Sequence, residues 1–268
     1  MGLRHVIGYG LLGVAVGALG TLIGAGGGFL LIPILLFLHP GDSAAVLTGI
    51  SLLVVCANAT AGSIAYGRMR RIDVRAGLVF ILAGLPGALA GAWATRHIER
   101  RVFDPLLGAV LILGGAAIFL SPRAGRVVSP SSRTRTLVEK DGTVHVYAPR
   151  IVLGGALSTG VGFLSSLLGI GGGILHVPAM VYLLGFPVHV ATATSHFVLA
   201  FLALAGVLVH ATQGDLAPGY ARALPLSAGV VAGAPIGAWL SNRIQGRWIL
   251  RGLALALASV GLRLLIAR

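Results

Sequence analysis

The stretch Gly24-Ala25-Gly26-Gly27-Gly28, followed by Pro33, recurs in the second half of the chain as Gly169-Ile170-Gly171-Gly172-Gly173, followed by Pro178. Each copy lies inside an apolar stretch that would otherwise form an unbroken helix. Glycine is unfavourable in a helix interior, so each copy predicts a place where the backbone breaks or closely approaches another group. We expect that group to be a substrate.

The two motifs belong to a duplication of about half the chain. Their matched glycines and prolines are displaced by 145 positions, from 24 to 169 and from 33 to 178. Further along, Ala61-Gly62 aligns with Ala205-Gly206 at a displacement of 144. We therefore predict two homologous transmembrane repeats, residues 1–120 and 151–268, joined by a basic linker over residues 121–150.

The composition places the chain in a lipid bilayer. Of its 268 residues 56% are hydrophobic and 10% are charged, and the mean hydropathy is +0.95, whereas a soluble domain carries about 25% charged residues. Eight apolar stretches approach or exceed the ~20 residues that cross a bilayer, and they cover roughly residues 5–38, 44–66, 76–95, 103–120, 151–184, 190–210, 223–242 and 252–267. The sequence predicts an all-α polytopic membrane protein with 8–10 membrane segments, depending on whether the first and fifth stretches are each one bent span or two helices broken at the Gly-rich motifs.

The net charge of +13 is concentrated between the spans and in the linker. Lys and Arg are enriched in cytoplasmic loops, so this charge indicates membrane orientation, a cytoplasmic linker and no nucleic-acid partner. Within the linker, Thr136–Val138 and Thr143–Tyr147 alternate around Asp141-Gly142 and predict a short hairpin. We assign no function to it.

The relative orientation of the two repeats depends on the Gly-rich stretches. With one bent span each, the repeats are parallel and the 20 Lys and Arg residues divide 14 to 6; with two helices each, the repeats are inverted and the division is 13 to 7. These counts do not separate the alternatives. Transporters with inverted repeats place broken helices near the midplane, where both reach one site, and this favours inversion.

The predicted membrane interior carries no formal charge. All seven acidic residues fall in loops or at span ends, no Lys or Arg lies deep in a span, and Cys56 is the only cysteine. We therefore expect no catalytic residues, no metal site and no cofactor. A small anion held by backbone dipoles and hydroxyl groups requires no intramembrane charge, and the helix that follows each glycine run offers free N–H groups at its start. Close helix packing is the alternative explanation of the glycines.

Several neutral polar residues complete the predicted site. Asn58 is included because an amide is costly to bury, Ser51 and Ser195 because they are equivalent at a displacement of 144, and His196 because it adjoins Ser195 and could exchange a proton. His176 is a weaker candidate for the same role. The predicted substrate-binding residues are Gly24, Gly26, Gly27, Gly28, Gly169, Gly171, Gly172, Gly173, Ser51, Asn58, Thr194, Ser195 and His196.

The duplicated Gly-x-Gly-Gly-Gly-x4-Pro motif and the segment Ala191-Thr192-Ala193-Thr194-Ser195 resemble the TauE/SafE family of sulfite and organosulfonate exporters, also called the TSUP permeases. The resemblance covers most of both halves. It implies a multi-pass protein of the prokaryotic cytoplasmic (inner) membrane that performs secondary transport of sulfite, an organosulfonate or another small anion. It does not imply which anion, and the long basic linker departs from shorter relatives.

Two rival functions share parts of this pattern. An uncoupled channel or facilitator for a small anion would use the same site, and flux against a gradient distinguishes it from a transporter. An intramembrane enzyme or assembly factor is disfavoured because the spans contain no positioned acid, base or nucleophile. The expected partners are the small anion and the lipid bilayer, and the membrane setting leaves room for a homodimer.

Overall fold

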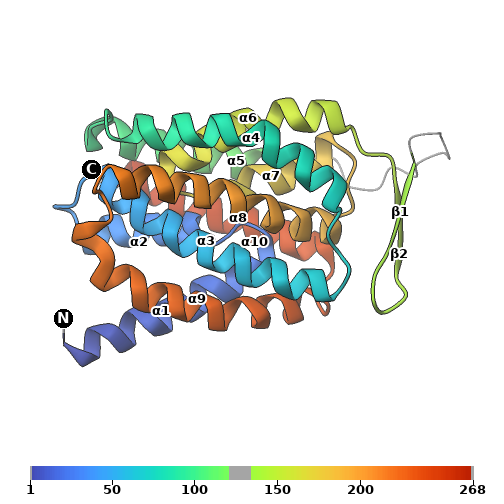
Figure 1. Cartoon of the computed structure of the whole chain (residues 1–268), viewed down its shortest axis with the longest axis horizontal. Coiled ribbons are helices and arrows are strands. Elements are labelled where there is room, and N and C mark those ends of the chain that lie inside the picture. The colour runs from blue at the N-terminus through green and yellow to red at the C-terminus, as the bar shows by residue number, and fades with distance from the viewer. Residues whose placement is uncertain (1, 121–133, 267–268) are drawn as a thin grey trace.

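The computed structural model describes residues 2–120 and 134–266 of the chain. They form a bundle of helices with one small hairpin at its end (Figure 1). The first half comprises α1 (Leu3–Ile23), α2 (Gly28–Leu38), α3 (Ala44–Arg68), α4 (Val74–Thr95) and α5 (Arg100–Leu120), and the hairpin comprises β1 (Arg135–Val138) and β2 (Val144–Tyr147). The second half comprises α6 (Ile151–Leu168), α7 (Gly173–Pro178), the π-helix η1 (Ala179–Leu183), α8 (Val188–Thr212), the 3₁₀ turn η2 (Ala217–Gly219), α9 (Tyr220–Ser241) and α10 (Gly246–Ile266).

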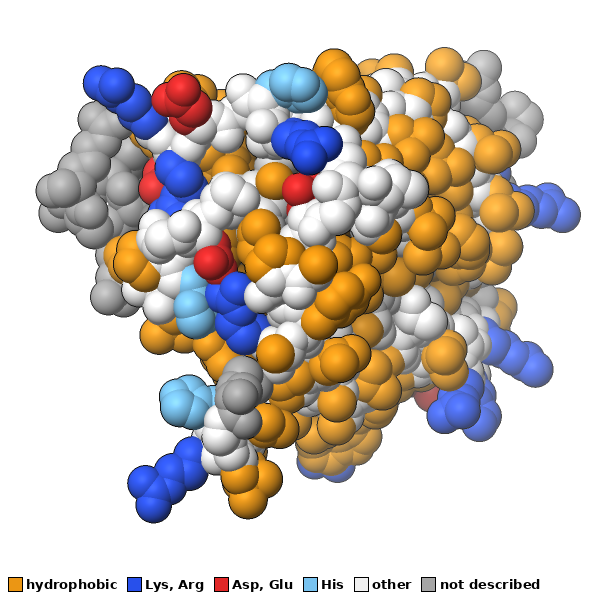
Figure 2. Space-filling model, turned by 60° about the vertical axis from the view of Figure 1, so that its left-hand side comes forward, with side chains coloured by type: hydrophobic (Ala, Val, Ile, Leu, Met, Phe, Trp, Pro, Cys, Tyr) orange, Lys and Arg blue, Asp and Glu red, His pale blue; other side chains and the backbone are white. Residues whose placement is uncertain are grey.

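The architecture confirms the expected all-α polytopic membrane protein. Six of the described helices are long and apolar enough to cross a bilayer: α1, α3, α4, α6, α8 and the segment Ala217–Ser241 that contains α9. Apolar side chains cover much of the visible flank of the bundle, as a lipid environment requires (Figure 2). The helices follow the apolar stretches of the sequence closely, although α10 begins at Gly246, earlier than the stretch near 252 indicates.

Each Gly-rich stretch consists of two helices that return to the end from which they enter. α1 ends at Ile23 and α2 begins at Gly28. The Tyr9 hydroxyl lies 2.6 Å from His39 Nε2, so the residue after α2 is back at the level of early α1. In the second half the Arg150 amide, just before α6, donates to the Leu184 carbonyl, just after η1, at 3.1 Å. Each pair is therefore a re-entrant helical hairpin, and three long helices follow it in each half (Figure 1).

The helices α3 and α8 run antiparallel through the centre of the bundle. Residue numbers rise along α3 as they fall along α8, because Gly49 lies against His210 and Gly62 lies against His196. Around this pair the contacts match when the halves are exchanged, because α1 packs on α9 as α6 packs on α4, and α3 packs on α9 as α8 packs on α4.

Small residues bring the outer helix pairs close together. Gly13 of α1 lies against Gly229 of α9, where an added Cβ atom would be 3.0 Å from the Gly229 Cα. On the other side of the bundle, a Cβ atom at Gly162 of α6 would lie 2.5 Å from the Gly84 oxygen of α4. Close backbone approach of this kind stabilises helix pairs in lipid, where the hydrophobic effect does not.

The hairpin β1–β2 has the turn expected around Asp141-Gly142, with Arg135 paired to Tyr147 and Val138 to Val144. The preceding linker residues, 121–133, lie outside the described part of the chain. In the hairpin, Glu139 accepts from Arg71 Nε at 2.8 Å and from Arg71 Nη2 at 2.5 Å, and both side chains are buried. The hairpin is thereby fixed to the loop between α3 and α4.

A second polar contact fixes the same loop. Asp73 accepts from Arg135 Nη1 at 2.9 Å and from the Tyr147 hydroxyl at 2.9 Å. Burial, reinforced by the Asp73 carboxylate, raises the pKa of Tyr147 well above its usual range. Tyr147 therefore stays protonated well above neutral pH and donates to Asp73.

The glycines Gly162 and Gly160 lie on the same helix, α6, and offer a matched test of close packing. Gly162→Ala places its methyl group against the Gly84 oxygen, whereas a Cβ atom at Gly160 has nothing within 4 Å. We expect Gly162→Ala to lower the free energy of unfolding by about 1–3 kcal/mol because α4 and α6 must separate. Gly160→Ala should not lower it, since alanine favours the helix. Equal thermal unfolding of the two variants in detergent would contradict the packing role.

Glu139→Gln should release the hairpin, because it leaves the buried Arg71 guanidinium without its counter-ion. Breaking a buried ion pair costs on the order of 3–5 kcal/mol. We expect faster tryptic cleavage after Lys140 than in wild type. Asp141→Asn, in the exposed turn, is the control and should be cleaved at the wild-type rate. Cleavage of Glu139→Gln at that same rate would show that other contacts hold the hairpin.

Candidate functional site

The two glycine motifs meet at the middle of the two central helices. Val55 and Leu199 are each the twelfth residue of a 25-residue helix, α3 and α8 respectively. A Cβ atom at Gly26 would lie 2.6 Å from Leu199 Cδ2 and 3.0 Å from Val55 Cγ1, and one at Gly171 would lie 2.7 Å from Val55 Cγ1. Both breaks therefore lie at the level where α3 and α8 cross.

The two glycine loops touch each other through their backbones. A Cβ atom at Gly28 would lie 2.6 Å from the Gly169 oxygen, and one at Gly173 would lie 2.6 Å from the Ala25 Cα. Real Cβ atoms do not approach backbone so closely. Glycine is required at positions 28 and 173 because the other repeat occupies the space of a side chain.

The remaining glycines allow backbone turns that other residues rarely adopt. Gly24, Gly26 and Gly27 have φ values of 84°, 74° and 84°, and Gly169 and Gly171 have values of 65° and 67°. Positive φ of this kind is nearly free for glycine and strained for L side chains. Glycine packing and a backbone break, which are alternative readings of the sequence, are thus both present at this crossing.

Ser51 and Ser195 each bind the glycine motif of the opposite repeat. The Ser51 hydroxyl donates to the Gly169 carbonyl at 2.6 Å, and the Ser195 hydroxyl donates to the Gly24 carbonyl at 3.1 Å. Both serines are fully buried. Each therefore fixes the carbonyl of the first glycine after a broken helix, which has lost its helical partner.

A polar cluster lies beside the first break and consists of Thr21, Asn58, Tyr66 and His196. The Thr21 hydroxyl donates to Asn58 Oδ1 at 3.1 Å, and the Tyr66 hydroxyl donates to the Thr21 carbonyl at 2.8 Å. The His196 ring meets the Tyr66 ring edge-on, with centroids 5.8 Å apart. All four side chains are fully buried.

Three polar atoms of this cluster lack a partner within the described chain. Asn58 Nδ2 and both His196 ring nitrogens make no hydrogen bond to a described residue. The His196 ring faces the backbone of Gly24 and Thr192 without reaching hydrogen-bond geometry. An unpaired buried polar group costs about 1–3 kcal/mol, so such a group is normally satisfied by water or a ligand.

Thr194, a predicted site residue, and His176, the weaker candidate, lie away from the glycine motifs. The Thr194 hydroxyl accepts from the Asp73 amide at 3.0 Å, so its contact is with the α3–α4 loop and not with the glycine motifs. His176 Nε2 lies 2.8 Å from the Ser158 hydroxyl on α6, and its ring is 5.8 Å from that of Phe80. The positions of Thr194 and His176 in the sequence do not show that these side chains lie away from the glycine motifs.

Sequence reasoning missed Tyr66 and the role of Gly62. Tyr66 lies eight residues after Asn58 on α3, a spacing that repeats on one helix face and could have suggested it. Gly62 lies under the His196 ring, where an added Cβ atom would be 2.5 Å from Cδ2.

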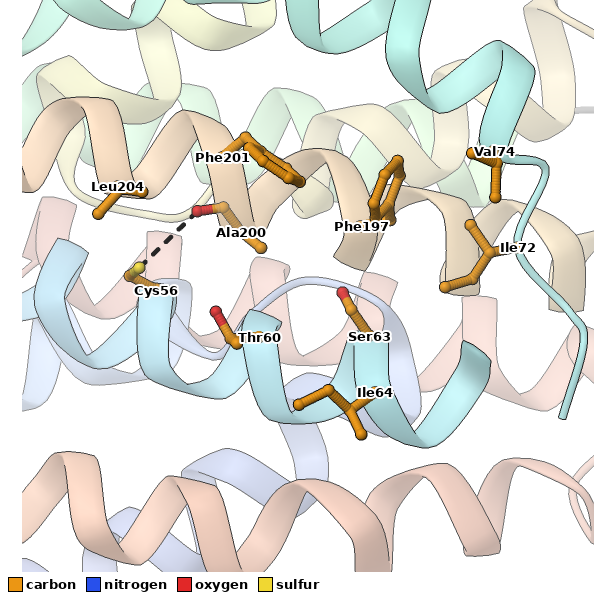
Figure 3. Close-up of a pocket in the computed structure, with 10 residues that line it drawn as sticks. All are labelled: Cys56, Thr60, Ser63, Ile64, Ile72, Val74, Phe197, Ala200, Phe201 and Leu204. Atoms are coloured by element: carbon orange, nitrogen blue, oxygen red, sulfur yellow. Dashed lines mark hydrogen bonds between the residues drawn. The ribbon is translucent and has the colours of Figure 1, made fainter. Parts of the chain in front are cut away.

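A separate pocket of about 380 Å³ lies between α3 and α8 (Figure 3). Its lining from α3 includes Cys56, Thr60 and Ser63, and its lining from α8 includes Phe197 and Phe201. It includes none of the predicted site residues.

Comparison with known proteins gives a consistent result. The model of the family described as sulfite exporter TauE/SafE matches residues 9–264. The probable membrane transporter protein YunE of Bacillus subtilis is 31% identical over 263 residues, which are 95% of this chain and 95% of YunE. A probable membrane transporter protein of Methanocaldococcus jannaschii is 28% identical over 75% of this chain and 71% of its own length. One from Xylella fastidiosa is 28% identical over 88% and 83%. No solved structure matches the chain.

Ser51→Ala and Ser195→Ala should each destabilise the crossing, because each leaves a buried glycine carbonyl of the opposite repeat unpaired. The expected loss is about 1 kcal/mol of unfolding free energy for each. Ser63→Ala is the matched control, since the Ser63 hydroxyl binds only the Ala59 carbonyl of its own helix. Thermal unfolding measures all three, and a loss in Ser63→Ala as large as in the other two would argue against an inter-repeat role.

Proposed function

The chain belongs to the sulfite exporter TauE/SafE family, and from this membership we propose that it is a secondary transporter that exports a small sulfur-containing oxyanion, such as sulfite or an organosulfonate. Its family and relatives identify it as a multi-pass membrane transporter and not as an enzyme. The proposal concerns the substrate, the direction of transport and the site.

One observation carries the proposal: the two glycine motifs meet beside the middle of α3 and α8, in surroundings that hold no formal charge. Among the described residues, the buried charged side chains are Arg71, Asp73 and Glu139, and all three belong to the hairpin contact at the end of the bundle. A site at the crossing must therefore bind its ligand with neutral groups. Neutral donors suit an anion and offer little to a cation.

The start of α2 supports an anion in particular. α2 begins at Gly28, and no side chain caps it at Gly27. The first amide groups of a helix have no acceptor within the helix, and the helix dipole adds positive potential there. Backbone N–H groups of this kind bind oxyanions without a cationic side chain. The proposed site consists of the predicted glycines with Ser51, Ser195, Asn58 and His196, while Thr194 contributes at most through the α3–α4 loop.

We further propose that the halves form an inverted repeat with the linker in the cytoplasm. Antiparallel α3 and α8, each the first long helix after a re-entrant hairpin, support this orientation. If α3, α4, α5, α8, α9 and α10 cross the bilayer while the hairpins that begin with α1 and α6 return, 13 of the 20 Lys and Arg residues fall at the linker end and 7 at the end of the termini. That excess agrees with a cytoplasmic linker.

Reconstitution tests the substrate class and the mode of transport together. Proteoliposomes should take up sulfite or sulfoacetate, and a pH gradient should drive the anion above its equilibrium distribution. Sulfate, thiosulfate and a monovalent cation serve as comparison substrates. Cation flux without anion flux would refute the substrate class. Anion flux that stops at equilibrium under every gradient would identify a channel instead of a transporter.

A further inference from the structure

The two repeats share a scaffold at the crossing but differ in chemistry. At the displacement of 144 that relates Ser51 to Ser195, the equivalent of Asn58 is Leu202 and the equivalent of His196 is Leu52. Each side chain of the polar cluster that leaves a hydrogen-bonding atom unpaired is thus replaced by leucine in the other copy. The two copies therefore differ in their side chains at positions on α3 and α8 that are otherwise equivalent.

The surroundings of these positions confirm that they are equivalent in space. A Cβ atom at Gly62 would lie 2.5 Å from His196 Cδ2 and 3.0 Å from His196 Nε2. A Cβ atom at the equivalent Gly206 would lie 2.8 Å from Leu52 Cδ1. In one copy a glycine supports an imidazole ring, and in the other copy a glycine supports a leucine.

The hydrogen bonds of the polar cluster orient its free donors. Because the Thr21 hydroxyl donates to Asn58 Oδ1, the amide is held with its Nδ2 group directed elsewhere. That group can donate two hydrogen bonds, and a neutral imidazole can donate one. Asn58 and His196 therefore offer up to three donors and no formal charge, which matches the oxygen atoms of one sulfite or sulfonate group.

Among the described residues, the place beside Leu52 and Gly169 has no unpaired amide or imidazole. Its unpaired polar atoms are the Thr48 and Ser166 hydroxyl oxygens, and the unpaired His176 Nδ1 belongs to a ring that lies against Ser158 and Phe80 instead. A hydroxyl group on a helix can turn to the carbonyl of its own preceding turn, so it does not require a ligand. The His196 ring faces the Thr192 backbone one turn back on α8 without reaching hydrogen-bond geometry, and Asn58 Nδ2 has no partner among the described residues.

We infer that the substrate site is one-sided: a single oxyanion binds at the first glycine break, held by Asn58 Nδ2 and a His196 ring nitrogen, while the equivalent place beside Leu52 and Leu202 binds none. This inference rests on the proposed function and goes beyond it. It sets one anion per chain and makes Asn58 and His196 the residues that determine specificity for the oxyanion.

Isothermal titration of purified full-length protein with sulfite tests the inference, using substitutions that exchange the repeats. Asn58→Leu and His196→Leu give each residue its equivalent from the other copy, and each should weaken sulfite binding at least tenfold. His196→Gln retains an amide donor and should lose less. Wild type should bind one sulfite per chain.

Gly62→Ala and Gly206→Ala form a matched pair of variants that leaves the Asn58 and His196 side chains unchanged. Gly62→Ala crowds the His196 ring and should weaken binding at least tenfold, whereas Gly206→Ala crowds Leu52 to a similar extent and should leave affinity within about twofold. Melting temperatures of both variants control for folding. Equal weakening in the two variants, or two sulfite ions per chain, would overturn the one-sided site.

The outcomes separate this inference from the proposed function. If wild type transports sulfite while Asn58→Leu, His196→Leu and Gly62→Ala bind it normally, the one-sided site is wrong and anion transport stands. If wild type neither binds nor transports sulfite, sulfoacetate, sulfate or thiosulfate, both are wrong.

Discussion

Direct backbone contact between the two glycine loops is the constraint on which the rest of the structure depends. Gly28 and Gly173 lie so close to the opposite loop that no side chain fits at either position. The re-entrant hairpins must therefore end at the same depth, and α3 and α8 must cross beside them. Ser51 and Ser195 then reach carbonyls that the broken helices have left unpaired. In lipid, non-helical backbone is tolerated only where such partners, water or a ligand satisfy it.

In the site that we infer, this scaffold carries its chemistry in one half only. A duplicated fold needs matching contacts in both copies to place both breaks, and the glycines and serines provide them. Binding one small anion needs donors in a single place. In the inferred site Asn58 and His196 supply them, and Leu202 and Leu52 occupy the matching positions in the other copy. Leaving polar atoms unpaired in a closed interior costs stability, so we regard the unpaired amide and imidazole beside the first glycine break as the signature of a binding site.

The sequence was informative wherever a feature is local. Apolar stretches mark the spans, and dense glycines mark the broken helices. The duplication adds one long-range signal, because its displacement of 144 singles out Ser51 and Ser195. It was uninformative wherever a feature depends on which distant segment arrives nearby. Arg71 and Glu139 are 68 positions apart, and nothing in either stretch predicts their ion pair. Thr194 meets the Asp73 amide for the same kind of reason, and the orientation of the repeats was open because the charge counts of both alternatives nearly coincide.

An experimental structure with bound selenite, located through the anomalous signal of selenium, would test the central claim most directly. We predict one anomalous peak per chain at the first glycine break, within hydrogen-bond distance of Asn58 Nδ2 and of a His196 ring nitrogen. Two peaks related by the exchange of the repeats, or a single peak in the pocket lined by Cys56 and Phe201, would contradict it.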